Sequence, residues 1–334
     1  MMKAVLLKDF GSADQLYIGE TEKPTPKEGE LLVRVEATTL NRADIVQRKG
    51  RYAPPPGASD ILGLETAGVI EAVGPNCGTW KVGDRIASLL TGGGYAQFCL
   101  LPYQLAIPIP DQLTFPQGAS IPEVWMTAYQ VLYFVADIET VKPEFVLIHA
   151  GASSVGIAAT QLATALGSKV IVTCGSQEKA DFCTQQVGAH AAIQYKQEAF
   201  EKRVEEITNG KGAGIIIDCV GGGYFQQNLA SLSVEGRLVI IGWLSGTQVP
   251  DCNLALILRK RLRIEGSTLR ARDLQYKEKL AAAIRDYCLP KILDGSFKIF
   301  IDREFPVGEI KEAHEYMEAN KNKGKIVISG FSSL

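Results

Sequence analysis

The sequence predicts an α/β protein in which a parallel, doubly wound sheet is inserted into a mostly antiparallel β domain. Its 334 residues exceed what one hydrophobic core normally organises, so we expect two domains. Short apolar runs separated by Gly and Pro fill the first third, which is typical of an irregular antiparallel sheet. From about Pro122 onward, Val- and Ile-rich runs alternate with amphipathic stretches, which indicates a parallel sheet.

These patterns place the elements in order along the chain. In the first third we expect strands in the runs AVLL, ELLVRVEATTL, TAGVIEAVG, DRIASLL and YAQFCLL. The strands FVLIHA, KVIVTC, AAIQY, GIIIDCV and RLVIIGW then alternate with helices over 157–166, 177–187, 198–208 and 225–232. After LRIEGSTL, a helical stretch over 273–293, the strand FKIFIDREFP, another helix and the strand GKIVIS return the chain to the first domain. The β domain is therefore placed at 1–122 and 270–334, and the domain with the parallel sheet at 123–269.

Composition narrows the function classes. A net charge of −2 gives no reason to expect nucleic acid or an anionic membrane as the main partner. The uncharged stretch from Phe145 to Ser168 is interrupted by polar residues and fits a strand followed by a helix better than a membrane span. The first residues lack a signal-peptide pattern, so we expect a cytoplasmic protein. Seven cysteines without a close pair favour neither a disulfide framework nor clustered structural zinc.

The stretch HAGASSVG, between a predicted strand and a predicted helix, has the pattern of a phosphate-binding turn. Gly151 and Gly156 stand at the first and last glycine positions of the dinucleotide motif, and Ser153 stands at the middle one. A small residue there still lets a pyrophosphate approach the backbone N–H groups at the helix N-terminus. An ordinary tight turn is the alternative, which the surrounding βαβ pattern makes less favourable.

The second strand of this domain distinguishes the two nicotinamide cofactors. A site for NAD normally places Asp or Glu there to accept from the ribose 2′-hydroxyl. Here the strand ends Thr173-Cys174-Gly175-Ser176-Gln177, with no acid, and Lys179 follows. A serine hydroxyl and a lysine suit a 2′-phosphate, so the sequence predicts NADPH.

These segments resemble a known family. FVLIHAGASSVGIAATQLA, TCGSQEK and AHAAIQYKQEAF are similar to the zinc-independent quinone oxidoreductases of the medium-chain dehydrogenase/reductase superfamily. Two long segments, NRADIVQRKGRYAPPPGASDILGLETAGVI and EAHEYMEANKNKGKIVI, resemble most the tumour-suppressor-inducible members. The resemblance covers essentially the whole chain. It implies a GroES-like, mostly β catalytic domain with an inserted Rossmann domain, and NADPH in the cleft between them.

The resemblance also implies cofactor-binding residues. Those expected at the pyrophosphate are Ser153, Ser154, Val155 and Gly156, and those at the 2′-phosphate are Gly175, Ser176, Lys179 and Tyr195. Those at the adenosine are Cys219 and Val220, and those at the nicotinamide are Gly242, Trp243, Leu244, Leu269 and Tyr52. Thr127 and Lys325 are expected near its ribose and phosphates. Simple packing of Tyr195 and a surface position for Lys325 stay open as alternatives.

No metal is expected. The zinc-dependent relatives carry Cys, His and Cys ligands, whereas this sequence has Asn41 at the first position and Leu64 in place of the histidine. Leucine does not coordinate zinc, and a neutral amide is a poor ligand for it. We expect Glu65 to pair with a nearby arginine rather than with a metal. Without a Lewis acid, acceptors that spread incoming charge by conjugation, such as quinones, suit the site best.

The sequence therefore predicts an NADPH-dependent quinone reductase that acts without metal. Asn41 and Tyr52 are the best polar candidates near the acceptor, Asp44 is a weaker one, and no histidine is placed as a proton donor. An enone or alkenal double-bond reductase and a non-catalytic NADPH-binding structural protein are the alternatives. The apolar strand Leu262–Leu269, expected at the sheet edge, predicts a homodimer.

Overall fold

The computed structural model describes residues 1–334 and divides into two compact units. Met1–Met126 and Leu269–Leu334 together form the first, called here the β unit. Thr127–Thr268 form the second, called the α/β unit. The chain passes from one to the other within helix α3 (Pro122–Tyr129) and returns after strand β13 (Arg263–Gly266).

The α/β unit contains one six-stranded sheet in the order β10-β9-β8-β11-β12-β13, and every pairing is parallel. The other strand bounds are β8 Phe145–Ile148, β9 Lys169–Cys174, β10 Ala191–Gln194, β11 Ala213–Asp218 and β12 Leu232–Ile240. This is the strand order of a dinucleotide-binding fold, in which the order reverses between β8 and β11. The predicted doubly wound parallel sheet is confirmed.

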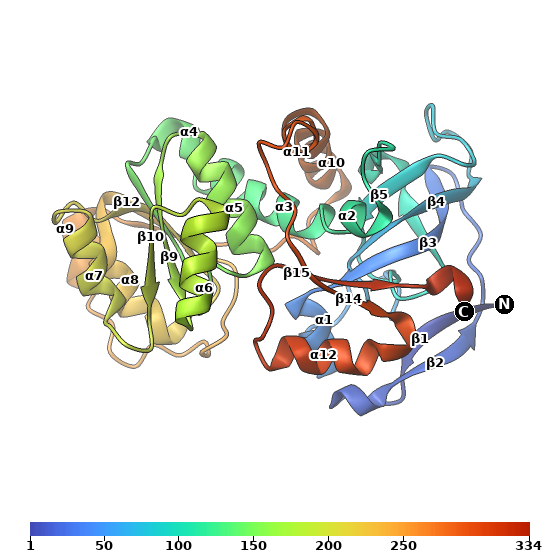
Figure 1. The fold of residues 1–334 in the computed structure, drawn as a ribbon, viewed down its shortest axis with the longest axis horizontal. Helices are drawn as coiled ribbons and strands as arrows, with labels where there is room; N and C mark the ends of the chain where they lie inside the picture. The colour runs from blue at the N-terminus through green and yellow to red at the C-terminus, as the bar shows by residue number, and fades with distance from the viewer. The chain divides into compact units, whose positions relative to one another are not determined.

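Helices cover both faces of this sheet. Their bounds are α4 Ile138–Val141, α5 Ser154–Ala165, α6 Gln177–Phe182, α7 Phe200–Ile207, α8 Phe225–Ser231 and α9 Leu254–Lys260. Helices α5 and α6 lie on one face, and α7 and α8 lie on the other (Figure 1). Because both faces are covered, the central strands β8 and β11 are apolar at nearly every position, and Leu147, Ile171 and Ile216 are fully buried.

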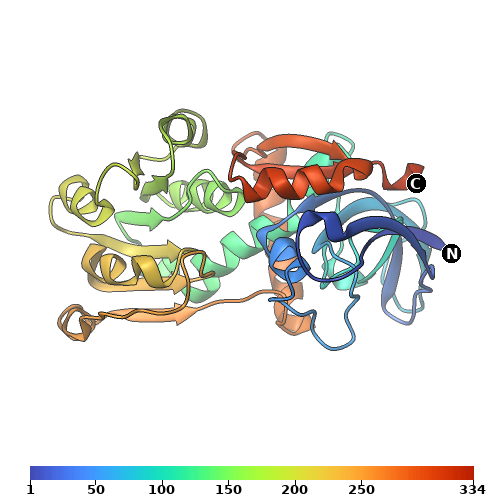
Figure 2. The same cartoon turned by 90° about the horizontal axis from the view of Figure 1, so that it is seen from below.

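The β unit is built on a mostly antiparallel sheet in the order β14-β15-β3-β4-β5-β7, with β6 also paired to β3. The bounds are β3 Glu30–Leu40, β4 Glu65–Val73, β5 Arg85–Leu89, β6 Phe98–Pro102, β7 Ile107–Pro108, β14 Ile301–Pro306 and β15 Lys325–Ser329. Strands β1 (Met2–Leu7) and β2 (Leu16–Thr21) form a separate hairpin. Strand β15 lies against β3. Both ends of the chain lie in this unit, near one another (Figures 1 and 2).

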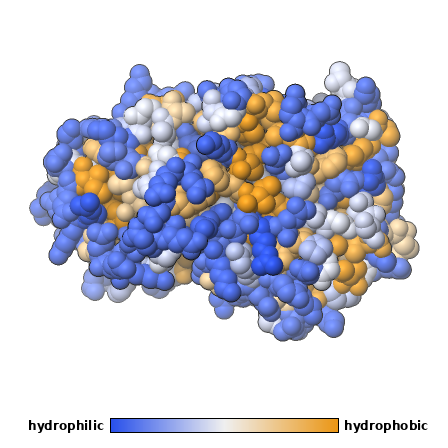
Figure 3. Space-filling view, in the orientation of Figure 1, coloured by the Kyte–Doolittle hydropathy of each residue, from blue (hydrophilic) through white to orange (hydrophobic).

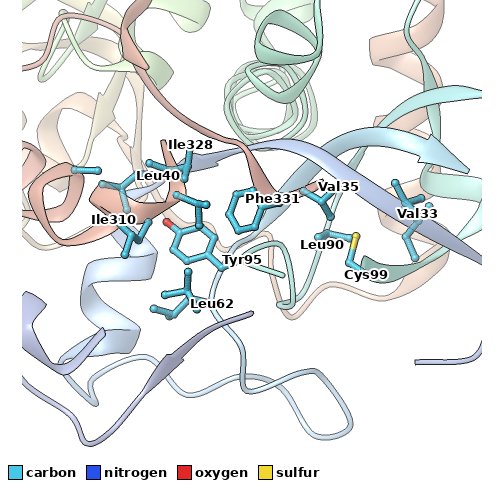
Figure 4. Packing of buried hydrophobic residues seen from close by; sticks show 14 of the residues in the cluster. Val33, Val35, Leu40, Leu62, Leu90, Tyr95, Cys99, Ile310, Ile328 and Phe331 are labelled. Carbon is cyan, nitrogen blue, oxygen red and sulfur yellow. The ribbon is translucent and has the colours of Figure 1, made fainter. Parts of the chain in front are cut away.

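The core of the β unit lies between this sheet, the β1–β2 hairpin and the helices over residues 42–48 and 310–318. Side chains of β3 and β15 meet Tyr95 and Phe331 there (Figure 4).

The helices of this unit are α1 Arg42–Arg48, α2 Phe115–Ala119, α10 Leu274–Ala283, α11 Leu289–Leu293 and α12 Ile310–Glu318. The helical stretch expected over 273–293 is interrupted by a π turn over Ile284–Cys288, and α1 and β2 were not expected at all. No helix in either unit combines the length and the apolar character needed to span a bilayer.

Gly68 on β4 marks a close approach between β4 and β3. A Cβ at this position would overlap the carbonyl oxygen of Arg34 on β3. Replacing Gly68 with Ala should therefore lower the free energy of unfolding by about 2–3 kcal/mol, because the central strands must separate. Urea denaturation of the full chain measures this. Gly308→Ala is the matched control, since a Cβ there meets nothing within 4 Å; equal losses for both variants would contradict the argument.

Candidate functional site

The phosphate-binding turn precedes α5 at the carboxyl end of β8. Ser153 is the N-cap of this helix, and its Oγ accepts a hydrogen bond from the Gly156 N–H at 3.1 Å. A Cβ on Gly156 would lie 2.6 Å from the carbonyl oxygen of Ala150, so the turn requires glycine there. The serine at the middle motif position thus starts the helix. The first-turn N–H groups of Ser154 and Val155 lack acceptors four residues back along the helix, which suits an anion.

The residues expected at the 2′-phosphate converge where β9 and β10 end. A Cβ on Gly175 would lie 3.0 Å from the hydroxyl oxygen of Tyr195, so the two residues are in close contact. Ser176 caps α6 and accepts from the Lys179 N–H at 3.4 Å. Tyr195 is 42% exposed, so it is not a core packing residue. A cavity of about 320 Å³ adjoins this group and is lined by residues 195–200, Tyr224 and Gln227.

The loops that follow β11 and β12 contact one another. The Leu244 N–H donates to the carbonyl oxygen of Cys219 at 3.2 Å, and the Ser245 N–H donates to that of Val220 at 2.8 Å. A Cβ on Gly242 would meet the Cys219 carbonyl at 3.0 Å. The structure therefore groups the residues expected at the adenosine with most of those expected at the nicotinamide, and it leaves the side chains of Trp243 and Leu244 exposed.

A buried polar network joins the carboxyl ends of three strands beneath these loops. His149 on the turn after β8 pairs through Nδ1 with Thr173 Oγ1 at 3.0 Å and through Nε2 with Asn228 Oδ1 at 2.7 Å. Asn228 donates to Asp218, whose carboxylate also accepts from the Val220 and Gly221 N–H groups. Burial lowers the pKa of His149 to about 4, so this imidazole is neutral and serves as a structural link.

The β unit holds a second polar cluster, centred on the ion pair of Lys325 and Glu65. The Lys325 ammonium lies 2.7 Å from Glu65 Oε1 and donates to Asn41 Oδ1 at 2.7 Å, and the lysine is 2% exposed. The Asn41 amide donates to Glu65 at 2.9 Å, and the Thr39 hydroxyl also donates to that carboxylate. The expected arginine partner of Glu65 was therefore wrong, because the cation is a lysine from β15. Lys325 is not a surface lysine either.

Two more carboxyl groups border this pair. Asp44 accepts from the backbone N–H groups of Asn41 at 2.8 Å and Gly63 at 3.1 Å, and burial raises its pKa to about 6. Glu123, at the start of α3, donates its backbone N–H to Glu65 Oε2 at 2.8 Å. Burial, followed by the nearby charge of Glu65, raises the pKa of Glu123 to about 8. Sequence reasoning missed Glu123, because no local pattern reveals that the start of α3 reaches Glu65.

Three further expected residues are Tyr52, Leu269 and Thr127. Tyr52 is partly buried in the loop after α1, and burial raises the pKa of its hydroxyl. Leu269 is buried where the chain re-enters the β unit, and Thr127 is on α3 at the beginning of the α/β unit. The roles expected for these residues at the cofactor stay predictions.

The donor set of the β-unit cluster does not fit zinc. Leu64 offers no ligand atom, and the Asn41 and Glu65 oxygens that could bind a cation already contact the Lys325 ammonium. No group of three His, Cys, Asp or Glu side chains anywhere in residues 1–334 could hold a metal ion. A metal would have to displace a buried, hydrogen-bonded lysine from an amide and a single carboxylate, which zinc does not favour.

Comparison with known proteins agrees with both halves of this description. Residues 27–111 match the family described as alcohol dehydrogenase GroES-like domain, and residues 154–285 match that described as zinc-binding dehydrogenase. The human quinone oxidoreductase is 30% identical over 98% of each chain. The Pseudomonas aeruginosa quinone oxidoreductase is 33% identical over 98% of this chain and 99% of its own. The chain belongs to the quinone oxidoreductase family.

Solved structures of related proteins have the same fold as this chain. A mycobacterial protein in complex with NADPH superposes with a TM-score of 0.87 at 30% identity, covering 99% of this chain and 100% of its own. The CurK enoyl reductase superposes with a TM-score of 0.85 at 28% identity, covering 98% and 99%. The GroES-like domain with an inserted Rossmann domain is thereby confirmed. The finer likeness to the tumour-suppressor-inducible members stays a prediction.

The raised pKa of Glu123 has a consequence for stability. The folded chain holds a proton on Glu123 up to about pH 8, whereas the unfolded chain releases it near the usual value of about 4.5. This group therefore makes the folded state less stable as the pH rises between these values. In Glu123→Gln, the free energy of unfolding should therefore fall by about 1–3 kcal/mol less over this pH range than in the unsubstituted chain. Urea denaturation at mildly acidic and mildly basic pH measures the difference from the unsubstituted chain.

Glu304→Gln on β14 is the control, because Glu304 is exposed. That variant should follow the pH dependence of the unsubstituted chain. If Glu123→Gln does the same, Glu123 ionises normally in the fold.

Proposed function

We propose that this protein transfers reducing equivalents from NADPH to quinones without a metal ion. The observation that carries the proposal is the group Gly175, Ser176, Lys179 and Tyr195 at the ends of β9 and β10, where β9 does not end in the acid that would oppose a 2′-phosphate. Related structures of the family contain NADPH. NADPH supplies the hydride, and the protein supplies binding and orientation.

The α/β unit holds the cofactor through backbone and side-chain donors. The N–H groups of Ser154 and Val155 bind the pyrophosphate at the start of α5, where the helix dipole favours an anion. Lys179, Ser176 and Tyr195 donate to the 2′-phosphate, and the loops after β11 and β12 border the rest of the molecule. The network of His149, Asn228 and Asp218 keeps these strand ends in register.

The β unit determines which acceptors can react. Its cluster offers no Lewis acid, so an isolated carbonyl would gain no stabilisation of an alkoxide. A quinone spreads the incoming charge over a conjugated ring and two oxygens. Asn41 and Tyr52 are the two polar candidates near the acceptor. The amide oxygen of Asn41 accepts from Lys325 and its nitrogen donates to Glu65, so the Tyr52 hydroxyl is the group left to contact the acceptor. The likeness to an enoyl reductase favours activated enones as a related second class of acceptor.

Cofactor preference tests the proposal. With a quinone acceptor, kcat/KM for NADPH should exceed that for NADH at least about tenfold, because a charge-assisted hydrogen bond contributes roughly 1.5–3 kcal/mol. Lys179→Ala should lower kcat/KM for NADPH and leave NADH nearly unchanged. Lys202→Ala on α7 is the control, since Lys202 is exposed on a helix outside the group. Equal efficiencies in the unsubstituted protein would overturn the NADPH assignment, and absence of turnover with any quinone would overturn the activity.

We also propose that two copies associate through the α/β unit. Strand β13 is the last strand of its sheet and pairs only with β12, so its outer edge is unpaired. Helix α9, which leads into β13, exposes Leu254 and Leu258, which are 67% and 80% exposed. Other apolar residues gather in patches on the face of the molecule that Figure 3 shows.

Light scattering should therefore give twice the chain mass of 36.2 kDa at micromolar protein concentration. Leu258→Glu should shift the mass toward that of one chain, because the charge would be buried in the contact. A single-chain mass for the unsubstituted protein would contradict the association.

A cytoplasmic location is the remaining part of the proposal. All seven cysteines are free thiols. Two of them, Cys174 and Cys183, lie with their sulfur atoms 3.6 Å apart and unlinked. Thiols this close persist most readily in a reducing compartment.

A further inference from the structure

Arg270 is a buried cation whose two outer guanidinium nitrogens have no hydrogen-bond partner. It lies in the turn between β13 and α10, in the β unit, and is 5% exposed. Its Nε donates to the carbonyl oxygen of Thr91 at 2.8 Å. Its Nη1 and Nη2 are both buried and donate to nothing. Arg270 is the one cation among the side chains with buried, unpartnered polar atoms.

Such an arrangement is costly for the folded chain alone. A buried charged group without its hydrogen bonds loses hydration that nothing replaces, and burial accordingly lowers the pKa of Arg270. The fold nevertheless holds the residue firmly in place. Lys277 on α10, itself buried, donates its ammonium to the Arg270 carbonyl oxygen at 2.6 Å. The backbone and the Nε are therefore fixed, while the two outer nitrogens are left for a partner from outside the chain.

The surroundings of the guanidinium identify that partner's chemistry. The guanidinium carbon lies 5.1 Å from the centre of the Tyr52 ring, so an aromatic face borders it. The ionisable groups that act on it are Tyr52, Asp44, Glu123 and Lys277. None of the carboxylates forms an ion pair with it, because Asp44 accepts from backbone N–H groups and Glu123 has a pKa of about 8 and is largely protonated at neutral pH. The charge of Asp44 acts on the guanidinium, but no carboxylate forms an ion pair with it.

We propose that Arg270 binds the oxygen of the acceptor that becomes negatively charged during reduction. This inference rests on the proposed quinone reduction and names a residue that stabilises its charged product. Tyr52, on the same guanidinium, provides an apolar face for the acceptor ring.

The electron balance explains why a cation is useful at this point. The acceptor receives a hydride, which is two electrons with one hydrogen nucleus, and it then carries one negative charge on a former carbonyl oxygen. One proton taken from water completes the hydroquinone. Fixed N–H donors on a buried cation stabilise the charge as it develops, because they need no reorganisation when it appears. Two parallel donors of one guanidinium also bind an anionic oxygen more strongly than neutral donors.

The first measurement uses binding without turnover. 4-Nitrophenol is neutral in mild acid and ionised in mild base, so it imitates the reduced acceptor before and after ionisation. Equilibrium dialysis against the NADP⁺-loaded protein should show at least about tenfold tighter binding of the ionised form. Nitrobenzene, which does not ionise, is measured in parallel to remove the effect of titrating the protein's own groups.

Variants assign this preference to Arg270. Arg270→Gln should abolish the difference between the two forms of nitrophenol, and Arg270→Lys should keep part of it because the charge remains. With a quinone, Arg270→Gln should lower kcat/KM about 100-fold or more while NADP⁺ affinity changes less than about twofold. Arg272→Gln is the control, since Arg272 is exposed two residues away. Thermal unfolding of each variant shows that it is folded.

The outcomes separate the two claims. If Arg270→Gln binds nitrophenolate as tightly as the unsubstituted protein does, Arg270 does not bind the acceptor oxygen, whatever the turnover. If Arg270→Gln does not fold, the comparison of Arg270→Lys with the unsubstituted protein decides, and an unchanged preference in that variant overturns the proposal. If nitrophenolate binds through Arg270 but no quinone is reduced, the proposed quinone reduction fails and the anion site stands.

Discussion

The ion pair between Lys325 and Glu65 organises the β unit. It joins the first residue of β15 to the first residue of β4, and through Asn41 and the Glu123 N–H it also reaches the start of α1 and of α3. Two buried charges are stable together only when their remaining hydrogen-bonding positions are also filled, which Asn41 and Thr39 do here. Removal of either charge would leave the other buried and unpaired, so the relative positions of four elements depend on this contact.

The same contact directs the chemistry of the unit. An ammonium ion already occupies the oxygens that a metal would use, so positive charge is present but is neutralised within the protein. Arg270 is the opposite case, a cation whose two outer nitrogens have no hydrogen-bond partner. The β unit thus contains one cation that stabilises the fold and a second that is left for a ligand. A zinc-dependent site would combine both tasks in one metal ion.

The sequence predicts the fold class well, because strands buried on both faces appear as continuous apolar runs and helices recur between them. The helix start in HAGASSVG was predictable as well, because the residues that cap the helix are neighbours in the sequence. Contacts between residues far apart in the sequence were not predictable. Glu65 was expected to pair with an arginine, but its partner lies 260 residues later in the chain. Arg270 contacts Thr91, 179 residues away. Its two outer nitrogens are unpaired because no acceptor from a distant part of the chain lies beside them, and no local sequence pattern predicts this.

The place of β15 between β14 and β3 has a consequence for biosynthesis. The α/β unit is one continuous segment, so it can complete its sheet as soon as residue 268 has left the ribosome. The β unit cannot, because β6 covers only residues 30–34 along this edge of β3, and residues 37–40 are covered only when residues 325–329 arrive. Until then Glu65 has no cation and the nascent chain presents an open strand edge. While the second half of the protein is still being made, that edge is open to pairing with strands of other chains.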